Sequence, residues 1–327
     1  MKTAQPTAKA VLEFDDNHAV QALYGPHHIH LERIEERLGV VVHAKGNQLV
    51  LSGPTSEVEA AKRALESLYN RARRNEELLT ADVDAALRLS AEGLATAVEE
   101  DLTIRTRKRH VSPRSPTQAA YIRQMLTKDL VFGLGPAGTG KTYLAVAMAV
   151  SMKITGRVDR IILSRPAVEA GERLGFLPGD LREKVDPYLR PLYDALYDTL
   201  PGERVAKFLE TGEIEVAPLA FMRGRTLTNA FIILDEAQNT TKVQMKMALT
   251  RLGENSIMVA TGDLSQVDLN KGEVSGLKDA LEVLEGLQGV GTVRFTHQDV
   301  VRHDLVTRIV QAYDARELQK KGRNENA

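Results

Sequence analysis

The chain contains no cysteine and no tryptophan among its 327 residues. The lack of cysteine excludes a disulfide framework, a thiolate nucleophile and a Cys-ligated metal site, and it favours a reducing compartment. No stretch reaches the roughly 18 apolar residues of a membrane span, and the N-terminal residues lack the apolar core of a signal peptide. We therefore expect a soluble, cytoplasmic protein that does not enter membranes.

Aromatic residues make up only 5% of the chain, so aliphatic side chains must form most of the core. The formal net charge is −1, and overall charge therefore gives no reason to expect binding to nucleic acid. The length suits two domains. We predict a small α+β domain over residues 1–74, a helical and basic linker over 75–112, a larger domain over 113–316 and a flexible tail over 317–327.

The first region has the pattern strand, helix, helix, strand, strand, helix. The expected elements lie at residues 11–14, 17–25, 30–39, 39–53 and 56–74, with the fourth range forming a hairpin. From residue 115 onward the pattern changes to short apolar runs separated by helical segments. The runs lie at residues 129–135, 160–164, 230–236, 256–263 and 292–296. This alternation predicts an α/β fold with a parallel sheet covered on both faces.

The sequence GPAGTGKT at residues 135–142 matches the phosphate-binding pattern G-x-x-x-x-G-K-[ST]. Glycines let backbone N–H groups surround the phosphates, Lys141 reaches the β and γ oxygens, and the Thr142 hydroxyl ligates Mg²⁺. We expect an apolar strand before the loop and an amphipathic helix after it, which places a helix N-terminus beneath the anion. The candidate nucleotide-binding residues are Gly135, Pro136, Ala137, Gly138, Thr139, Gly140, Lys141, Thr142 and Tyr143.

Two further motifs follow buried strands. In FIILDEAQ, Asp235 is the candidate to hold Mg²⁺ together with Thr142, and Glu236 is the candidate to polarise the attacking water. In ATGDLSQVD, Gln266 is the candidate to orient that water. Each motif has a plainer interpretation, because an Asp-Glu pair often begins a helix and Gly-Asp often forms a turn.

The order of these three motifs is similar to motifs I, II and III of superfamily 1 helicases, and Gln118 resembles their upstream glutamine that reads adenine. This resemblance favours ATP over GTP. More specifically, residues 163–196 closely resemble the signature segment of the PhoH-like ATPases, and residues 231–241, 262–269 and 299–306 fit the same family. The resemblance implies a RecA-like fold and an Mg²⁺-dependent ATPase linked to RNA metabolism, including ribosomal-RNA processing and ribosome maturation. It also implies a YbeY-type metal-dependent endoribonuclease as a partner.

Only about sixty residues follow Gln266, whereas a second RecA-like domain needs roughly 100 to 200. We therefore expect one such domain, whose γ-phosphate site needs an arginine from elsewhere. Arg302 is the leading candidate together with Arg308, and Arg165 and Arg173 are the alternatives. If the arginine acts in trans, the protein must form a homo-oligomer such as a hexamer.

The element order of residues 1–74 resembles a KH domain, as found before the ATPase in the YbeZ-type branch of the family. KH domains clamp the nucleic-acid backbone with a GXXG loop, and here Gly25 is present but His28 occupies the second glycine position. RNA binding and protein docking both stay open for this region. The cluster His27, His28 and His30 could suggest metal binding, but we expect solvated loop histidines because no other ligand completes a site.

A basic run is the better candidate for contact with RNA phosphates. It comprises Arg105, Arg107, Lys108, Arg109 and Arg114. If the run is a strand, alternation places Arg105, Arg107 and Arg109 on one side. Phe176, Tyr188 and Tyr193 could stack on bases, although we expect at least one of them to pack in the core.

Three functions compete at this point. The first is an ATP hydrolase that acts on RNA, and the second is a nucleotide-gated adaptor that docks an endoribonuclease and turns over slowly. The third is a small-molecule kinase, because kinases share the phosphate loop. Glu236, placed to activate water, argues against the kinase.

Overall fold

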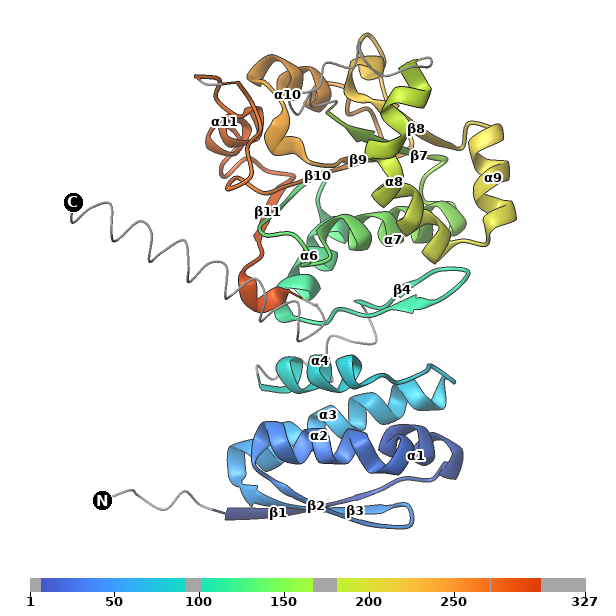
Figure 1. Cartoon of the computed structure of the whole chain (residues 1–327), viewed down its shortest axis with the longest axis vertical. Helices are drawn as coiled ribbons and strands as arrows, with labels where there is room; N and C mark the ends of the chain where they lie inside the picture. Colours follow the sequence, from blue (N-terminus) through green and yellow to red (C-terminus); the bar gives the residue numbers. More distant parts are fainter. Residues whose placement is uncertain (1–6, 92–101, 167–180, 271, 301–327) are drawn as a thin grey trace, which may run out of the picture.

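The computed structural model describes residues 7–91, 102–166, 181–270 and 272–300. Two units stack along the long axis of the molecule (Figure 1). We call residues 7–91 the N-terminal unit and the described residues from 102 to 300 the α/β unit. Among the helices of these residues, none is long and apolar enough to cross a membrane.

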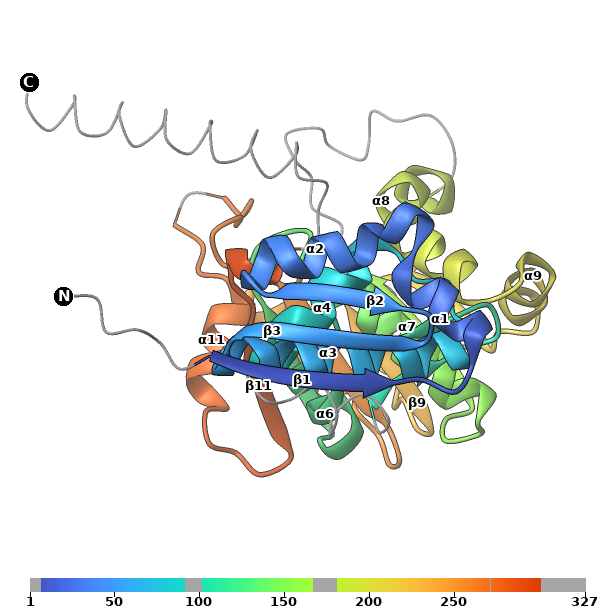
Figure 2. The ribbon, with the colours of Figure 1, turned by 90° about the horizontal axis from the view of Figure 1, so that it is seen from below.

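The N-terminal unit is a three-stranded antiparallel sheet covered by helices on one face. Its elements are β1 (Thr7–Glu13), α1 (Asn17–Tyr24), α2 (Ile29–Leu38), β2 (Val41–Lys45), β3 (Gln48–Pro54), α3 (Thr55–Arg73) and α4 (Thr80–Ala91). The strand order is β1-β3-β2. Figure 2 shows these strands at one end of the molecule, with α3 and α4 behind them. The first six elements occur in the order that the sequence predicts.

Helix α4 lies in the stretch that the sequence analysis treats as a linker. Its residues Val83, Ala86 and Leu87 are buried and belong to the same hydrophobic cluster as Leu65 and Leu68 of α3. The helix therefore adds to the core of the N-terminal unit, and in Figure 1 it lies between α3 and the α/β unit.

The α/β unit contains a six-stranded sheet in which every pairing is parallel. Its strands are β6 (Leu130–Leu134), β7 (Arg160–Arg165), β8 (Ile214–Pro218), β9 (Ala230–Leu234), β10 (Ile257–Gly262) and β11 (Val290–Arg294), in the order β11-β6-β10-β9-β7-β8. Its helices are α6 (Pro116–Thr127), α7 (Lys141–Ile154), α8 (Leu181–Thr199), α9 (Gly202–Glu210), α10 (Lys242–Leu249) and α11 (Gly276–Val283). The α/β class with a parallel sheet is confirmed.

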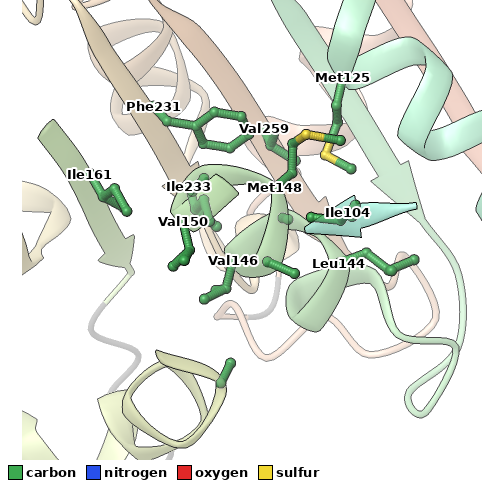
Figure 3. Close-up of a cluster of buried hydrophobic side chains, with 14 of the residues drawn as sticks. Ile104, Met125, Leu144, Val146, Met148, Val150, Ile161, Phe231, Ile233 and Val259 are labelled. Carbon is green, nitrogen blue, oxygen red and sulfur yellow. The ribbon is translucent and has the colours of Figure 1, made fainter. Parts of the chain in front are cut away.

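Alternate strand residues face two separate hydrophobic clusters. Phe231 and Ile233 of β9 point toward the layer that contains α6, α7 and α8, whereas Ile232 and Leu234 point toward α10 and α11. Figure 3 shows part of the first cluster, in which side chains of α7 pack against β9, β7 and Ile104. Both faces of the sheet are therefore covered.

The expectation that an amphipathic helix follows the phosphate loop is wrong. In α7 every residue from Leu144 to Val150 is buried, because the sheet lies on one side and α6, α8 and Ile104 cover the others. A helix enclosed in this way has apolar residues on all its faces, so it lacks the polar face of an amphipathic helix.

The basic run is not one continuous strand. A two-stranded hairpin forms instead, with β4 (Ile104–Arg105) paired to β5 (His110–Val111). The turn is closed by a hydrogen bond from Thr106 N to Arg109 O at 3.1 Å. Arg107 and Lys108 therefore lie at the tip, and the condition under which Arg105, Arg107 and Arg109 would share one side of a strand is not met.

Candidate nucleotide-binding site

The phosphate loop joins β6 to α7 at the carboxyl edge of the sheet. Gly135, Gly138 and Gly140 have φ angles of 137°, 82° and 83°, which favour glycine. A Cβ atom on Gly135 would also collide with the carbonyl oxygen of Phe295, just after β11. The glycines of the motif are thus required by the backbone path, and Gly140 begins α7 as its N-cap.

Lys141 is the first residue of α7, and only 9% of it is exposed. Its Nζ donates hydrogen bonds to the carbonyl oxygens of Gly135 at 2.6 Å and Pro136 at 2.8 Å. The ammonium group therefore curls back over the loop, where it can exchange these carbonyls for phosphate oxygens.

Asp235 joins the loop to the neighbouring strands. Its Oδ1 accepts hydrogen bonds from the hydroxyl of Thr142 at 2.7 Å and from that of Thr261 at 2.6 Å. The carboxylate follows β9, Thr261 lies in β10, and Asp235 is 4% exposed. Because β10 lies between β6 and β9, the sheet order brings these three groups together. A carboxylate beside a hydroxyl supplies the hard oxygen ligands that Mg²⁺ prefers, so these residues fit the ion.

Glu236 has the left-handed φ angle of 53° and begins a short 3₁₀ turn at Ala237–Asn239. Two side chains hold its carboxylate: Arg165 NH2 lies 3.3 Å from Oε1, and Gln238 Nε2 donates to Oε2 at 2.6 Å. Arg165 is the last residue of β7, the strand beside β9. An arginine of the same chain therefore reaches the site.

These groups surround a pocket of about 250 Å³, which we call the loop pocket. It is lined by Ala137, Gly138, Gly140, Lys141, Thr142, Tyr143, Asp235, Glu236, Gly262, Asp263 and Gln266. Burial raises the pKa of Asp263, but hydrogen bonds from Ser265 and the charge of Lys141 outweigh it, so the pKa lies below its ordinary value. Asp263 Oδ2 also accepts a hydrogen bond from Gln266 Nε2 at 2.8 Å.

Gln118 connects the loop to the start of the α/β unit. Its Nε2 donates to Thr139 O at 3.0 Å, and its Oε1 accepts from Arg114 N at 2.6 Å. The residue is 4% exposed. Both ends of the amide are thus bonded to backbone groups of the protein.

Sequence reasoning did not single out Gln238 or Asp198. Gln238 bridges two motifs, because its Nε2 also donates to Gln266 O at 3.2 Å while its Oε1 accepts from Asp263 N at 3.2 Å. Its place in DEAQ, two residues after Glu236, is the signal that could have identified it. Asp198 Oδ2 accepts from the Tyr143 hydroxyl at 2.8 Å, and its position in α8 gives no such signal.

Burial, assisted by the hydrogen bond to Asp198, raises the pKa of Tyr143 to about 12. The phenol beside the loop therefore stays neutral at physiological pH.

Other candidate residues lie apart or fall outside the described residues. Arg173, Phe176, Arg302 and Arg308 fall outside, as does the Tyr188 side chain. Tyr193 packs against the main core, in agreement with the expectation that at least one aromatic residue of the signature is a packing residue.

The histidine cluster differs from the expectation. His27 and His28 are exposed and have φ angles of 52° and 64°, so His28 adopts the conformation that a glycine would favour. His30 is not solvated, because it is buried in α2 with its Nδ1 3.0 Å from Leu23 O. Among the described residues no group of three or more His, Asp or Glu side chains could hold a metal ion.

A parallel α/β sheet, a G-x-x-x-x-G-K-T loop between β6 and α7, and an acidic pair after β9 together define a P-loop NTPase type of fold. The family model described as PhoH-like protein matches residues 110–314. The chain is 48% identical to the PhoH-like protein of Bacillus subtilis over 297 residues, which cover 90% of this chain and 93% of that one. It therefore belongs to the PhoH-like family.

The family match extends to other bacteria. The chain is 50% identical to protein PhoH of Escherichia coli over 202 residues, 61% of this chain and 57% of that protein. The solved Sulfolobus solfataricus SWI2/SNF2 ATPase core in complex with dsDNA is 16% identical, with a TM-score of 0.33. The match covers 55% of this chain and 43% of that one, and a similarity this low indicates nothing about activity.

Proposed function

We propose that the protein binds ATP with Mg²⁺, hydrolyses it, and uses hydrolysis in RNA metabolism such as ribosomal-RNA processing. The observation that carries the catalytic part is the Thr142–Asp235 contact beside the glycine loop, with Glu236 next to it on the same pocket. The RNA part rests on the resemblance to PhoH-like ATPases.

Several residues of the loop pocket have proposed roles that follow from their positions. Backbone N–H groups of the loop and Lys141 bind the phosphates, and Thr142 with Asp235 would hold Mg²⁺. The ion would neutralise charge on the phosphate oxygens when bound. Glu236 would accept a hydrogen bond from the attacking water and polarise it, while Gln266 would orient that water.

The decisive measurement is phosphate release from Mg-ATP, with and without single-stranded RNA. We expect Lys141→Ala and Glu236→Gln each to lose about 100-fold or more in turnover, since each removes an electrostatic or water-activating group. Lys207→Ala, on the exposed face of α9, is the control with the same type of change and should behave as wild type. Normal turnover by Lys141→Ala would disprove the site.

A slow, nucleotide-gated adaptor is the second candidate. It is favoured by the engagement of Glu236 with Arg165 and Gln238 if these two contacts occupy the side of the carboxylate that the attacking water needs. The adaptor would bind ATP with little turnover, even with RNA, and would retain an endoribonuclease only when nucleotide is present. Pull-down of such a nuclease with and without ATP distinguishes this candidate from the first.

The γ-phosphate site needs an arginine, and whether it comes from the same chain or from another copy decides whether the protein must form an oligomer. Arg165 supplies one arginine within the chain, whereas Arg302 is the candidate to act in trans within a homo-oligomer such as a hexamer. Native mass with and without ATP tests this proposal. A monomer in both conditions would assign the role to an arginine of the same chain.

A further inference from the structure

A cavity of about 900 Å³ lies between the two units. We call it the inter-unit cavity. Its N-terminal wall includes Arg74, Asn75 and Glu76, which follow α3, and its opposite wall includes Gln118, Gly138 and Tyr143. Its volume falls within the range of small-molecule sites, which is about 300 to 1,000 Å³.

The inter-unit cavity adjoins the loop pocket. Gly138, Gly140 and Tyr143 line both. If phosphates occupy the loop, these shared residues leave the inter-unit cavity within reach of the other end of the nucleotide. That end is the nucleoside.

Some polar side chains around the inter-unit cavity have partners among the described residues, and others do not. Arg71 is paired with Glu76 at 3.0 Å and with Asp82 at 3.2 Å. The exposed side chains of Arg74 and Asn75, by contrast, show no hydrogen bond or ion pair to the other residues that the structure describes. The positive φ of 58° at Asn75 turns the chain at this wall. The wall thus offers a guanidinium and an amide for hydrogen bonds to a ligand.

One polar chain connects the phosphate loop to this wall. Gln118 Nε2 donates a hydrogen bond to Thr139 O, and Gln118 Oε1 accepts one from Arg114 N. The Arg114 guanidinium lies 3.5 Å from Asp82 of α4.

A second polar chain starts from Tyr143, immediately after the loop. Its hydroxyl donates to Asp198, which pairs with Arg109 of the hairpin at 2.6 Å. The adjacent His110 lies 3.5 Å from Glu76 of the N-terminal unit. Two polar chains therefore join the loop to the N-terminal unit, and they meet at Arg71, which pairs with both Asp82 and Glu76.

We propose that the nucleoside part of the bound nucleotide occupies the inter-unit cavity and contacts Arg74 and Asn75, so that the N-terminal unit completes the nucleotide site and responds to its occupancy. This inference rests on the proposed function. It adds that the base and ribose are held by residues of both units, and that the nucleotide favours the docked arrangement of the two.

The test compares Mg-ATP with Mg-tripolyphosphate, which carries the three phosphates without a nucleoside. Calorimetric titration gives the affinity of each ligand for the full chain. We expect Arg74→Ala and Asn75→Ala to weaken ATP binding by about 2- to 12-fold each, the range for one hydrogen bond. Both variants should bind tripolyphosphate as wild type does. Arg73→Ala is the matched control, since Arg73 lies over the Tyr69 ring and does not line the cavity.

Hydrogen exchange provides a second measurement that needs no variant. ATP should slow exchange in residues 74–79, and tripolyphosphate should leave it unchanged. Equal binding of ATP and tripolyphosphate by wild type, or ATP binding unaltered in the Arg74→Ala, Asn75→Ala double variant, would overturn the inference and leave the phosphate site intact. If neither ligand bound wild type, the proposed function would fall with it.

Discussion

Each oxygen of the Glu236 carboxylate has a side-chain partner, and this arrangement indicates the role of Arg165 in catalysis. Arg165 comes from the adjacent strand, so it fixes one side of the carboxylate while Gln238 fixes the other. We interpret Arg165 as a positioning residue that aims Glu236 at the water site and adds positive charge beside the phosphates.

We predict that Arg165→Ala lowers kcat for ATP hydrolysis by about 10-fold, which is less than the roughly 100- to 10,000-fold contribution of a positioned base, because Glu236 itself is retained. The dissociation constant of ATP should change by less than about 2-fold, because the phosphates are bound by the loop and Lys141. Arg160→Ala, at the opposite end of β7, is the control. A rise in kcat would instead mean that the ion pair withholds Glu236 from water.

The phenol of Tyr143 predicts a dependence of stability on alkaline pH. Its pKa rises from 10.0 to about 12, first because of burial and then because of the bond to Asp198. A raised pKa in the folded state means that this contribution is complete below pH 10 and is lost as the pH rises toward about 12. We expect the free energy of unfolding of Tyr143→Phe, measured by urea titration, to fall less steeply across that window than that of wild type. If the free energies of unfolding of the two proteins fell equally steeply with pH, the raised pKa of Tyr143 would be contradicted.

Most of the site residues that could be predicted from the sequence were found through the chemistry of the motifs. GPAGTGKT and DEAQ identified residues that the structure brings within hydrogen-bond distance, because those patterns specify both residue type and spacing. Asp198 could not be found in the same way. Its contact with Tyr143 joins positions 55 residues apart in the chain and depends on how α8 packs on α7.

Helices α10 and α11 show how an element can depend on one small residue. Gly276 begins α11, and its N–H donates to Thr240 O at 2.7 Å, two residues before α10. A Cβ atom there would collide with Thr241 O and would lie 2.8 Å from the Met245 side chain. The closeness of the two helices therefore requires a glycine at this position.

We predict that Gly276→Ala lowers the free energy of unfolding by about 1 to 3 kcal/mol, the usual cost of overpacking. Gly202→Ala is the matched control, since Gly202 also begins a helix and its Cβ would meet only Tyr197 at 3.8 Å. That change should be neutral or stabilising, because alanine favours helix over glycine by up to about 1 kcal/mol. Equal effects in chemical denaturation would show that the close approach does not matter.

Elements were predictable where local pattern and burial agree. The four buried strands β6, β7, β9 and β10 appear in the sequence as apolar runs of the expected length. Strand β11 lies at one edge of the sheet and exposes Thr292 and Arg294, and the run predicted for it begins two residues later than the strand does. Strand β8 was missed, because IEVAP lies at the sheet edge, pairs only with β7, and carries a glutamate and a proline. The surroundings of α7 and the hairpin at residues 104–111 also depend on tertiary packing, which no local pattern contains.

Across the whole molecule, Asp82 connects the two units. It is 5% exposed, accepts from Leu79 N at 2.9 Å, and faces Arg71 of its own unit and Arg114 of the α/β unit. Burial lowers the pKa of Arg71, but the charges of Asp82 and Glu76 outweigh it, so that pKa lies above its ordinary value. The carboxylate therefore offsets two positive charges that meet at the boundary between the units.

We predict that Asp82→Asn uncouples the units, because the amide leaves the charges of Arg71 and Arg114 less compensated. In wild type, saturating Mg-ATP should slow hydrogen exchange in α7 and also in α3, since binding stabilises whatever the nucleotide holds together. In Asp82→Asn the protection should persist in α7 and fall in α3. Asp84→Asn is the control: Asp84 pairs with Arg33 and Arg37 inside the N-terminal unit, so the variant should weaken that unit yet keep its response to ATP. Undiminished protection of α3 in Asp82→Asn would mean that the nucleotide alone, without this ion pair, holds the units together.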